Sequence, residues 1–162
     1  MQSTLKSWSR NSHIENISCT SVINIYLFGA YSEIETKKFA YVAKLFELIN
    51  AHQIHAIVSL YTLQEIYVFC KRIFSANDAG QIAKLALSAL FNNEFELCGL
   101  LSREERLLYR KRFNINDLSD QPHVISAYLN KCDAIVTYDN HFQQIKDKIS
   151  VYSPEEITAK LK

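Results

Sequence analysis

Asp120-Gln121-Pro122-His123-Val124-Ile125-Ser126-Ala127 is the first of two stretches that decide the fold class of this chain. The second, after six intervening residues, is Ala134-Ile135-Val136-Thr137-Tyr138-Asp139. The first stretch places an acid before an apolar helical run, with a proline that a first helical turn tolerates. The second stretch is a short apolar strand that ends near an acid. Two carboxylates at the ends of adjacent elements can converge on a metal ion of the kind that handles phosphate esters.

Strands and helices alternate on either side of these stretches. Strands are predicted over 21–28, 54–59, 95–101, 134–138 and 149–152, and helices over about 33–52, 62–74 and 78–91, and after Ser102, Asp120, Asp139 and Ser153. Capping-box patterns begin at Ser32, Thr62 and Ser102. Ser153 is predicted to cap the last helix, with a proline at the first helical position and acids in the first turn. This order predicts a three-layer α/β/α fold with a central parallel sheet of about five strands.

Length and composition indicate one globular domain. The 162 residues are 48% hydrophobic and 22% charged, so disorder is not expected, and we predict a flexible extension over 1–17 followed by a single domain over 18–162. No apolar stretch reaches the length of a membrane span, so we expect a cytoplasmic protein with no membrane contact. The four cysteines lack paired spacing and are expected to be reduced. A net charge of +1 leaves any binding of a polyanion to a local patch.

Four polar residues are expected at the carboxyl edge of the sheet, where ligands collect in such folds. Asn24 lies in the first predicted strand, Glu65 early in the helix after the second, Asp120 at a helix start and Asp139 after the fourth strand. Each also has a structural explanation. Glu65 completes a capping box, Asp120 and Asp139 can be caps or turn residues, and Asn24 can satisfy a backbone group.

The same residues resemble the motifs of PIN-domain nucleases. Thr137-Tyr138-Asp139-Asn140-His141-Phe142 looks like the family's closing motif, the stretch 120–127 like its acid-led helix, Glu65 like the acid on its second helix, and Val151-Tyr152-Ser153-Pro154-Glu155-Glu156 like its common ending. The resemblance runs in order from about residue 20 to 157, and its motifs are more specific together than alone.

This resemblance implies a metal-dependent endoribonuclease of the VapC-like toxin type. Glu65, Asp120 and Asp139 would bind Mg²⁺ or Mn²⁺, and Asn24 would complete the catalytic set by orienting water. The implied partners are an RNA substrate, an antitoxin protein and a second copy of the chain in a homodimer.

The first motif departs from the family pattern. The family's first strand usually ends in Asp-Thr-Asn or a close relative, and alignment on Asn24-Ile25-Tyr26-Leu27 places Val22 at the acid. Valine cannot bind a hard cation. Asp117 could supply a carboxylate or be a turn residue. The sequence therefore leaves open whether the chain cleaves RNA. One alternative is a degenerate domain that binds RNA or a protein without cutting, and the other is a module that serves assembly alone.

Arginines offer phosphate contacts. Arg103, Arg106 and Arg110 recur on one helical face, and Arg72 follows Glu65 by two turns; a solvated face paired with Glu104 and Glu105 is the competing interpretation of the first three. His123 and His141 lie near the candidate acids, although histidines in such positions are more often surface or packing residues than ligands. Serine hydrolase, phosphate-loop and dinucleotide-binding motifs are absent from the sequence, which has only three glycines.

Overall fold

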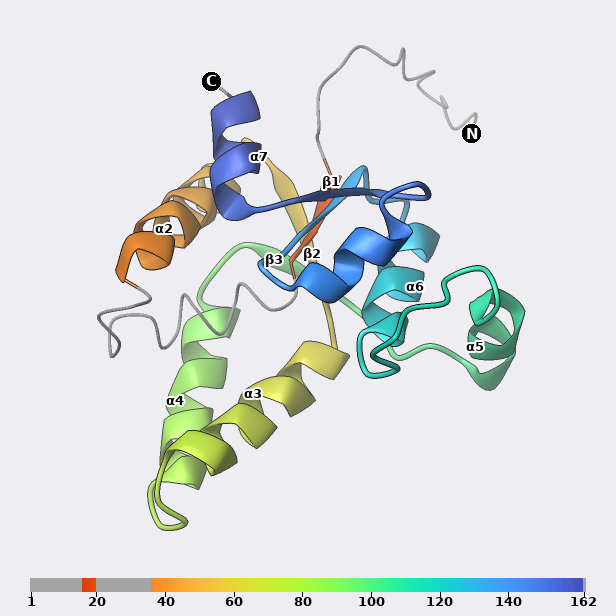
Figure 1. Cartoon of the computed structure of the whole chain (residues 1–162). Helices are drawn as coiled ribbons and strands as arrows, with labels where there is room; N and C mark the ends of the chain where they lie inside the picture. Colours follow the sequence, from red (N-terminus) through yellow and green to blue (C-terminus); the bar gives the residue numbers. More distant parts are fainter. Residues whose placement is uncertain (1–15, 20–35, 162) are drawn as a thin grey trace, which may run out of the picture.

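A five-stranded parallel sheet forms the centre of the computed structural model, which describes residues 16–19 and 36–161 (Figure 1). Its strands are β1 (Asn16–Cys19), β2 (His55–Ser59), β3 (Phe95–Cys98), β4 (Ala134–Val136) and β5 (Ser150–Tyr152). Every neighbouring pair is parallel, and the order across the sheet is β3-β2-β1-β4-β5. The predicted α/β fold with a parallel sheet is confirmed.

The central strand β1 begins earlier than the sequence pattern suggested. It pairs with both β2 and β4, starting at Asn16, so the predicted boundary between residues 17 and 18 falls inside a strand of the sheet. Its sequence, Asn-Ile-Ser-Cys, is short and half polar, which hides it in a hydropathy pattern, although Ile17 and Cys19 are fully buried. The strand predicted over 21–28, with Val22 and Asn24, lies outside the described residues.

Six α-helices and one 3₁₀ helix are described. They are α2 (Thr36–Asn50), α3 (Tyr61–Ile73), α4 (Ala79–Phe91), α5 (Arg103–Tyr109), α6 (Gln121–Leu129), the 3₁₀ helix η2 (Asn140–Ile145) and α7 (Pro154–Lys160). These helices fall where the sequence pattern predicted helices. None of the helices in this part of the chain is long and apolar enough to cross a lipid bilayer. All four cysteines are buried and free of disulfides, as expected.

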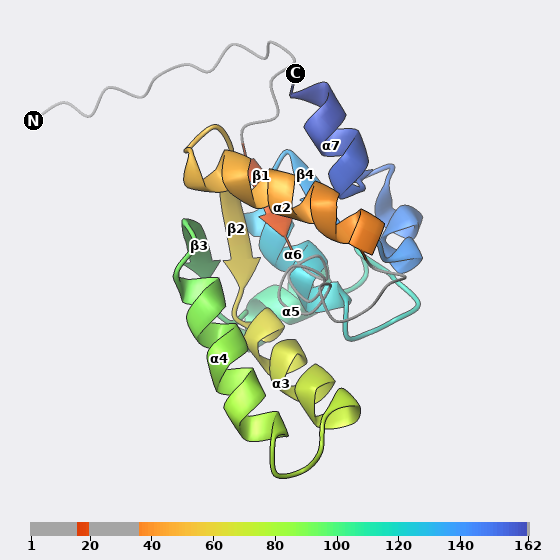
Figure 2. The ribbon, with the colours of Figure 1, turned by 90° about the vertical axis from the view of Figure 1, so that its left-hand side faces the viewer.

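Helices cover both faces of the sheet because successive strand residues point to opposite sides. Ala56 and Val58 of β2 belong to one core, which α2, α3, α4 and α7 complete. Ile57 between them belongs to the second core, which is built with α6 and η2. Figures 1 and 2 show α2 and α7 side by side over one face and α6 against the other. The result is the three-layer α/β/α arrangement.

Two of the predicted helix caps, at Ser102 and Ser153, are confirmed, and the one at Thr62 is wrong. Ser102 and Ser153 form complete capping boxes, each with a glutamate three residues later. Thr62 does not cap α3, because the helix already begins at Tyr61 and its N-cap residue is Leu60, with no side-chain hydrogen bond. Glu65 is therefore free of the capping role that its spacing suggested, and its carboxylate is used elsewhere.

The elements that follow the strands meet at the carboxyl edge of the sheet. Helix α3 starts directly after β2 and packs antiparallel against α4, and this hairpin projects beyond the edge (Figure 2). The loop before α6 and the turn after β4 approach the same edge. These connections bring residues distant in sequence into one site.

Candidate functional site

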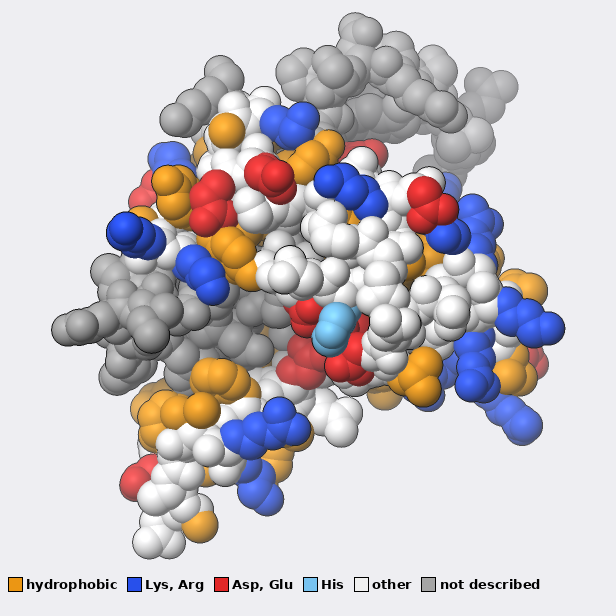
Figure 3. Space-filling model, viewed as in Figure 1, with side chains coloured by type: hydrophobic (Ala, Val, Ile, Leu, Met, Phe, Trp, Pro, Cys, Tyr) orange, Lys and Arg blue, Asp and Glu red, His pale blue; other side chains and the backbone are white. Residues whose placement is uncertain are grey.

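A cleft of about 680 Å³ lies at the carboxyl edge of the sheet, between α3, the loop before α6 and the turn after β4. Its described lining residues are Tyr61, Gln64, Glu65, Val68, Phe69, Arg72, Arg106, Asp117, Leu118, Ser119, Asp120, Pro122, His123, Asp139 and Phe142. Glu65, Asp120 and Asp139, the three acids singled out by the sequence motifs, thus share one cleft. Figure 3 shows acidic side chains gathered around a histidine near the centre of this face.

Asp120 occupies the N-cap position of α6 without capping it. Its backbone is already helical, with φ −79° and ψ −23°, and its carboxylate makes no capping hydrogen bond, so the predicted cap role is wrong. The residue is only 9% exposed, and its Oδ2 is buried and accepts no hydrogen bond from the described residues. Burial raises the pKa of Asp120 to about 6, and the negative charges of Asp139 and Asp117 add to the increase.

Asp117 faces Asp120 from the preceding turn. Its Oδ1 accepts hydrogen bonds from the backbone N–H of Ser119 at 2.8 Å and from the Ser119 hydroxyl at 2.6 Å, which fixes the turn. These bonds hold the pKa of Asp117 below its usual value. Its other oxygen, Oδ2, lies 4.0 Å from the ring nitrogen Nδ1 of His141. Asp117 is therefore both a turn residue and a member of the cluster, two roles that the sequence left as alternatives.

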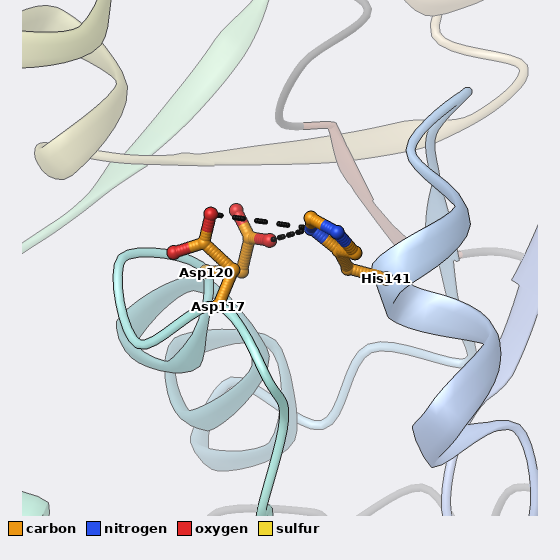
Figure 4. A group of neighbouring side chains, drawn as sticks. All are labelled: Asp117, Asp120 and His141. Carbon is orange, nitrogen blue, oxygen red and sulfur yellow. Dashed lines mark ion pairs between the residues drawn. The ribbon is translucent and has the colours of Figure 1, made fainter.

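His141 lies among the carboxylates of this cluster. Its Nδ1 is 3.4 Å from Asp120 Oδ2, and one potential ligand atom each from Asp117, Asp120 and His141 lie within 4.8 Å of one another. Figure 4 shows the imidazole on η2 pointing toward the two carboxylates. This spacing suits three ligands of one metal ion.

Asp139 joins the cluster from the turn after β4. Its Oδ1 accepts the backbone N–H of His141 at 2.8 Å, which caps η2, and lies 3.4 Å from His141 Nδ1. The Thr137 hydroxyl accepts the backbone N–H of Asp139 at 2.9 Å and steadies this turn. Asp139 therefore caps η2 and also lines the cleft, so the two predicted alternatives do not exclude each other.

Glu65 stands on the α3 wall of the cleft and is held by a buried histidine. His123 is 1% exposed, and its Nε2 lies 2.7 Å from Glu65 Oε1. Its Nδ1 lies 3.1 Å from the hydroxyl oxygen of Ser59, which also accepts the backbone N–H of Tyr61 at 3.2 Å. A neutral His123 with its proton on Nε2 satisfies every one of these contacts.

This serine, histidine and acid do not form a hydrolytic triad. The serine is 1% exposed, so it cannot reach a substrate, and the acid is at the open end of the network. The network runs from the core outward and orients the Glu65 carboxylate.

The candidate arginines separate into two groups. Arg72 and Arg106 line the cleft, and the guanidinium of Arg106 lies over the ring of Tyr61, 5.9 Å from its centre. Arg103 and Arg110 are not among the described lining residues. Of the three arginines predicted to form one face, Arg106 is the one that lines this cleft, and their joint role in RNA binding stays a prediction. No ion pair links these arginines to Glu104 or Glu105 among the described residues.

The sequence motifs did not place Asp117, His123 and His141 among the candidate site residues. The Asp117-x-x-Asp120 spacing before a helix and the histidine two residues after Asp139 were available signals. His123 had no such signal, because its contact with Glu65 spans 58 positions of the chain.

The donor set fits a divalent cation. Ligand atoms of Asp117, Asp120 and His141 lie within 4.8 Å of one another, and Asp139 Oδ1 lies 3.4 Å from the same histidine. The buried Asp120 Oδ2 lacks a hydrogen-bond donor among the described residues, which is costly unless a cation or a proton is supplied. Carboxylate oxygens are the ligands that Mg²⁺ and Mn²⁺ prefer. Asp117, Asp120 and Asp139 could hold such an ion, with Glu65 on the opposite wall.

The fold and the site define an α/β protein with an acid-lined cleft beyond a parallel sheet. Residues 24–141 match the family model described as PIN domain, and the chain therefore belongs to the PIN-domain family. The fold is similar to that of a chain in the crystal structure of VapBC2 from Rickettsia felis bound to a DNA fragment from their promoter, with a TM-score of 0.57 and 15% identity. That match covers 84% of this chain and 96% of the other. No relative among proteins of curated function matches at a significant level.

Proposed function

We propose that this chain is a metal-dependent endoribonuclease of the PIN type that acts as the toxin of a toxin–antitoxin pair. The observation that carries the proposal is the meeting of Glu65, Asp120 and Asp139, from three separate elements, in one cleft. Arg72 and Arg106 on the wall of the same cleft support a phosphodiester substrate, since guanidinium groups bind phosphate oxygens well.

In this proposal the acids and arginines divide the work. Asp117, Asp120 and Asp139 would hold Mg²⁺ or Mn²⁺, which when bound supplies the positive charge that activates water and offsets charge developing on the phosphate. Glu65, oriented by His123, would accept a proton or complete the ligand set. Arg72 and Arg106 would fix the RNA backbone across the cleft, and Asn24, outside the described residues, is proposed to orient water.

The first acid of the family pattern has two candidate positions, Val22 and Cys19. The described part of β1 ends at Cys19, at the carboxyl edge of the sheet, and Cys19-Thr20-Ser21 shares the threonine of Asp-Thr-Asn, whereas Val22-Ile23-Asn24 shares its asparagine. We propose Cys19 as the position of the missing acid, because it is the described residue at the end of the central strand, and Val22 stays the alternative. Burial raises the pKa of its thiol, so it stays protonated and offers no ligand to a hard cation.

This substitution favours a second candidate function, RNA binding with weak or no cleavage. The remaining carboxylates can still bind a metal, but with one unit of negative charge fewer than the family pattern supplies. Metal-dependent cleavage of RNA distinguishes the two candidates. Salt-sensitive RNA binding without cleavage would support the second. A protein that neither binds nor cleaves RNA would have an assembly role.

The proposal is tested with Mn²⁺ and two cleft variants. Mn²⁺ should raise the melting temperature, because a ligand that binds only the folded state stabilises it, and Asp120→Asn and Asp139→Asn should each reduce the rise. Asp147→Asn is the matched control, since Asp147 is exposed and pairs with Lys148 outside the cleft. Cleavage of a labelled RNA in Mn²⁺ and in chelator gives the second readout. An undiminished rise in both cleft variants would reject this metal site.

The proposed partners are an antitoxin protein and a second copy of the chain. The fold neighbour VapBC2, bound to promoter DNA, supports an antitoxin partner. Co-expression with the product of a small neighbouring open reading frame that encodes a DNA-binding protein should give a stable complex and suppress cleavage. Light scattering on the purified chain tests the homodimer.

A further inference from the structure

One imidazole nitrogen lies at the centre of the acidic cluster. His141 Nδ1 is 3.4 Å from Asp120 Oδ2, 3.4 Å from Asp139 Oδ1 and 4.0 Å from Asp117 Oδ2. Figure 4 shows the ring edge that carries this nitrogen directed toward Asp117 and Asp120. A nitrogen so placed is within reach of any cation that these carboxylates bind.

The backbone fixes the position of this nitrogen. The N–H of His141 donates to Asp139 Oδ1 at 2.8 Å, which anchors the residue at the start of η2. Nδ1 is the ring nitrogen nearer the backbone, so few torsions separate it from this anchor. The side chain is half exposed, which leaves the cluster open to an ion from solvent.

A second observation points to a cation at the same place. The Asp120 side chain is only 12% exposed, and its buried Oδ2 has no hydrogen-bond donor among the described residues and faces His141 Nδ1 at 3.4 Å. A buried carboxylate oxygen without a donor is costly, and a metal ion relieves that cost.

We propose that His141 is a nitrogen ligand of the divalent ion, together with Asp117 and Asp120, and that the site consequently selects Mn²⁺ or another first-row transition ion over Mg²⁺. Imidazole is a good ligand for transition ions, whereas Mg²⁺ favours oxygen and dehydrates reluctantly. The inference rests on the proposed function, because it assigns the ligands and the ion class of that same site.

A purely electrostatic role for His141 predicts the opposite change in metal affinity when the ring is removed. If the ring were only a cation that fills the cluster in the metal-free protein, an entering metal would have to displace it. Removal of the ring would then tighten metal binding, whereas removal of a ligand weakens it.

The experiment measures Mn²⁺ and Mg²⁺ affinity by calorimetry and detects nitrogen coordination by the ¹⁴N coupling in pulsed EPR spectra of bound Mn²⁺. The parent is compared with His141→Ala and with His141→Glu, which replaces the nitrogen by a carboxylate. His55→Ala is the matched control, because His55 is also half exposed and also pairs with a carboxylate, Glu96, but lies at the start of β2, outside the cleft. Melting temperatures in chelator check that each variant folds.

We expect ¹⁴N coupling in the parent, its loss in both His141 variants, and Mn²⁺ affinity about tenfold weaker in His141→Ala. His141→Glu should bind Mg²⁺ more tightly than the parent does. Mn²⁺ binding without ¹⁴N coupling, or with affinity unchanged or increased in His141→Ala, would overturn the inference and leave the nuclease proposal standing. Nitrogen-coordinated Mn²⁺ without RNA cleavage would support the inference and count against catalysis. Absence of Mn²⁺ binding by the parent would overturn it together with the metal site.

Discussion

His123 holds Glu65 by a 2.7 Å contact between its Nε2 and the carboxylate Oε1. The histidine is buried and the glutamate is about one-third exposed, so the contact joins the core to the open cleft. Ser59 anchors the other side of the ring. The geometry makes His123 a positioning residue for a candidate ligand, because ligand carboxylates bind best when their own hydrogen bonds fix them.

Replacement of His123 should therefore weaken metal binding, although His123 itself does not contact the ion in this proposal. His123→Leu removes the donor to Glu65, and we expect Mn²⁺ affinity to fall by about tenfold. His123→Gln can donate to Glu65 and accept from Ser59, so it should retain most of the affinity. Calorimetric titration of the folded variants gives the comparison, and equal affinity in His123→Leu and the parent would contradict a positioning role.

The buried Asp120 carboxyl predicts a pH dependence of stability. Its pKa is about 6 in the folded protein, against an ordinary value of 3.8, so between these values the folded state holds a proton that the unfolded chain releases. The stability that this proton contributes is present at low pH and is lost as the pH rises through about 6. In chelator, Asp120→Asn should gain about 2 kcal/mol relative to the parent between pH 4 and pH 7. Urea unfolding of both proteins at each pH measures the gain, and parallel pH profiles would refute it.

The two groups of arginines predict different effects on RNA affinity. Arg72→Ala with Arg106→Ala should reduce the salt dependence of binding, by about 0.7 in slope for each phosphate of single-stranded RNA that these side chains neutralise. Arg103→Ala with Arg110→Ala removes the same charge from outside the cleft and is the matched control. Binding is measured over a series of salt concentrations. Equal slopes in both double variants would remove the cleft arginines from the RNA site.

The position of the missing acid is tested by restoring it. Cys19→Asp should cost several kcal/mol in chelator, because an unpaired carboxylate would be buried at the end of β1, and should regain stability with Mn²⁺. It should also create or raise RNA cleavage. Val22→Asp introduces the same carboxylate at the position that the sequence alignment favoured. If only Val22→Asp gains metal binding and cleavage, the assignment of Cys19 is wrong.

Local sequence patterns were sufficient for most of the fold. The apolar run at 134–136 predicted β4, and the serine and glutamate spacing at Ser102 and Ser153 predicted two helix starts, because these signals depend on neighbours along the chain. The same reasoning misassigned Thr62, since a capping pattern is present in the sequence even though the helix begins two residues earlier than that cap would place it. It also missed β1, where only pairing on both sides reveals a strand.

The sequence by itself determined the fold class of the protein and pointed to three of the acids that line its cleft, Glu65, Asp120 and Asp139. Strand and helix periods and acids at element ends are local properties of the chain. Only the tertiary structure decided which residues meet. Glu65 and His123 lie on different helices, and Asp117 from the turn before α6 approaches His141 at the start of η2 across the carboxyl edge of the sheet. Strand order, crossover paths and helix packing set such distances, and no spacing along the chain encodes them.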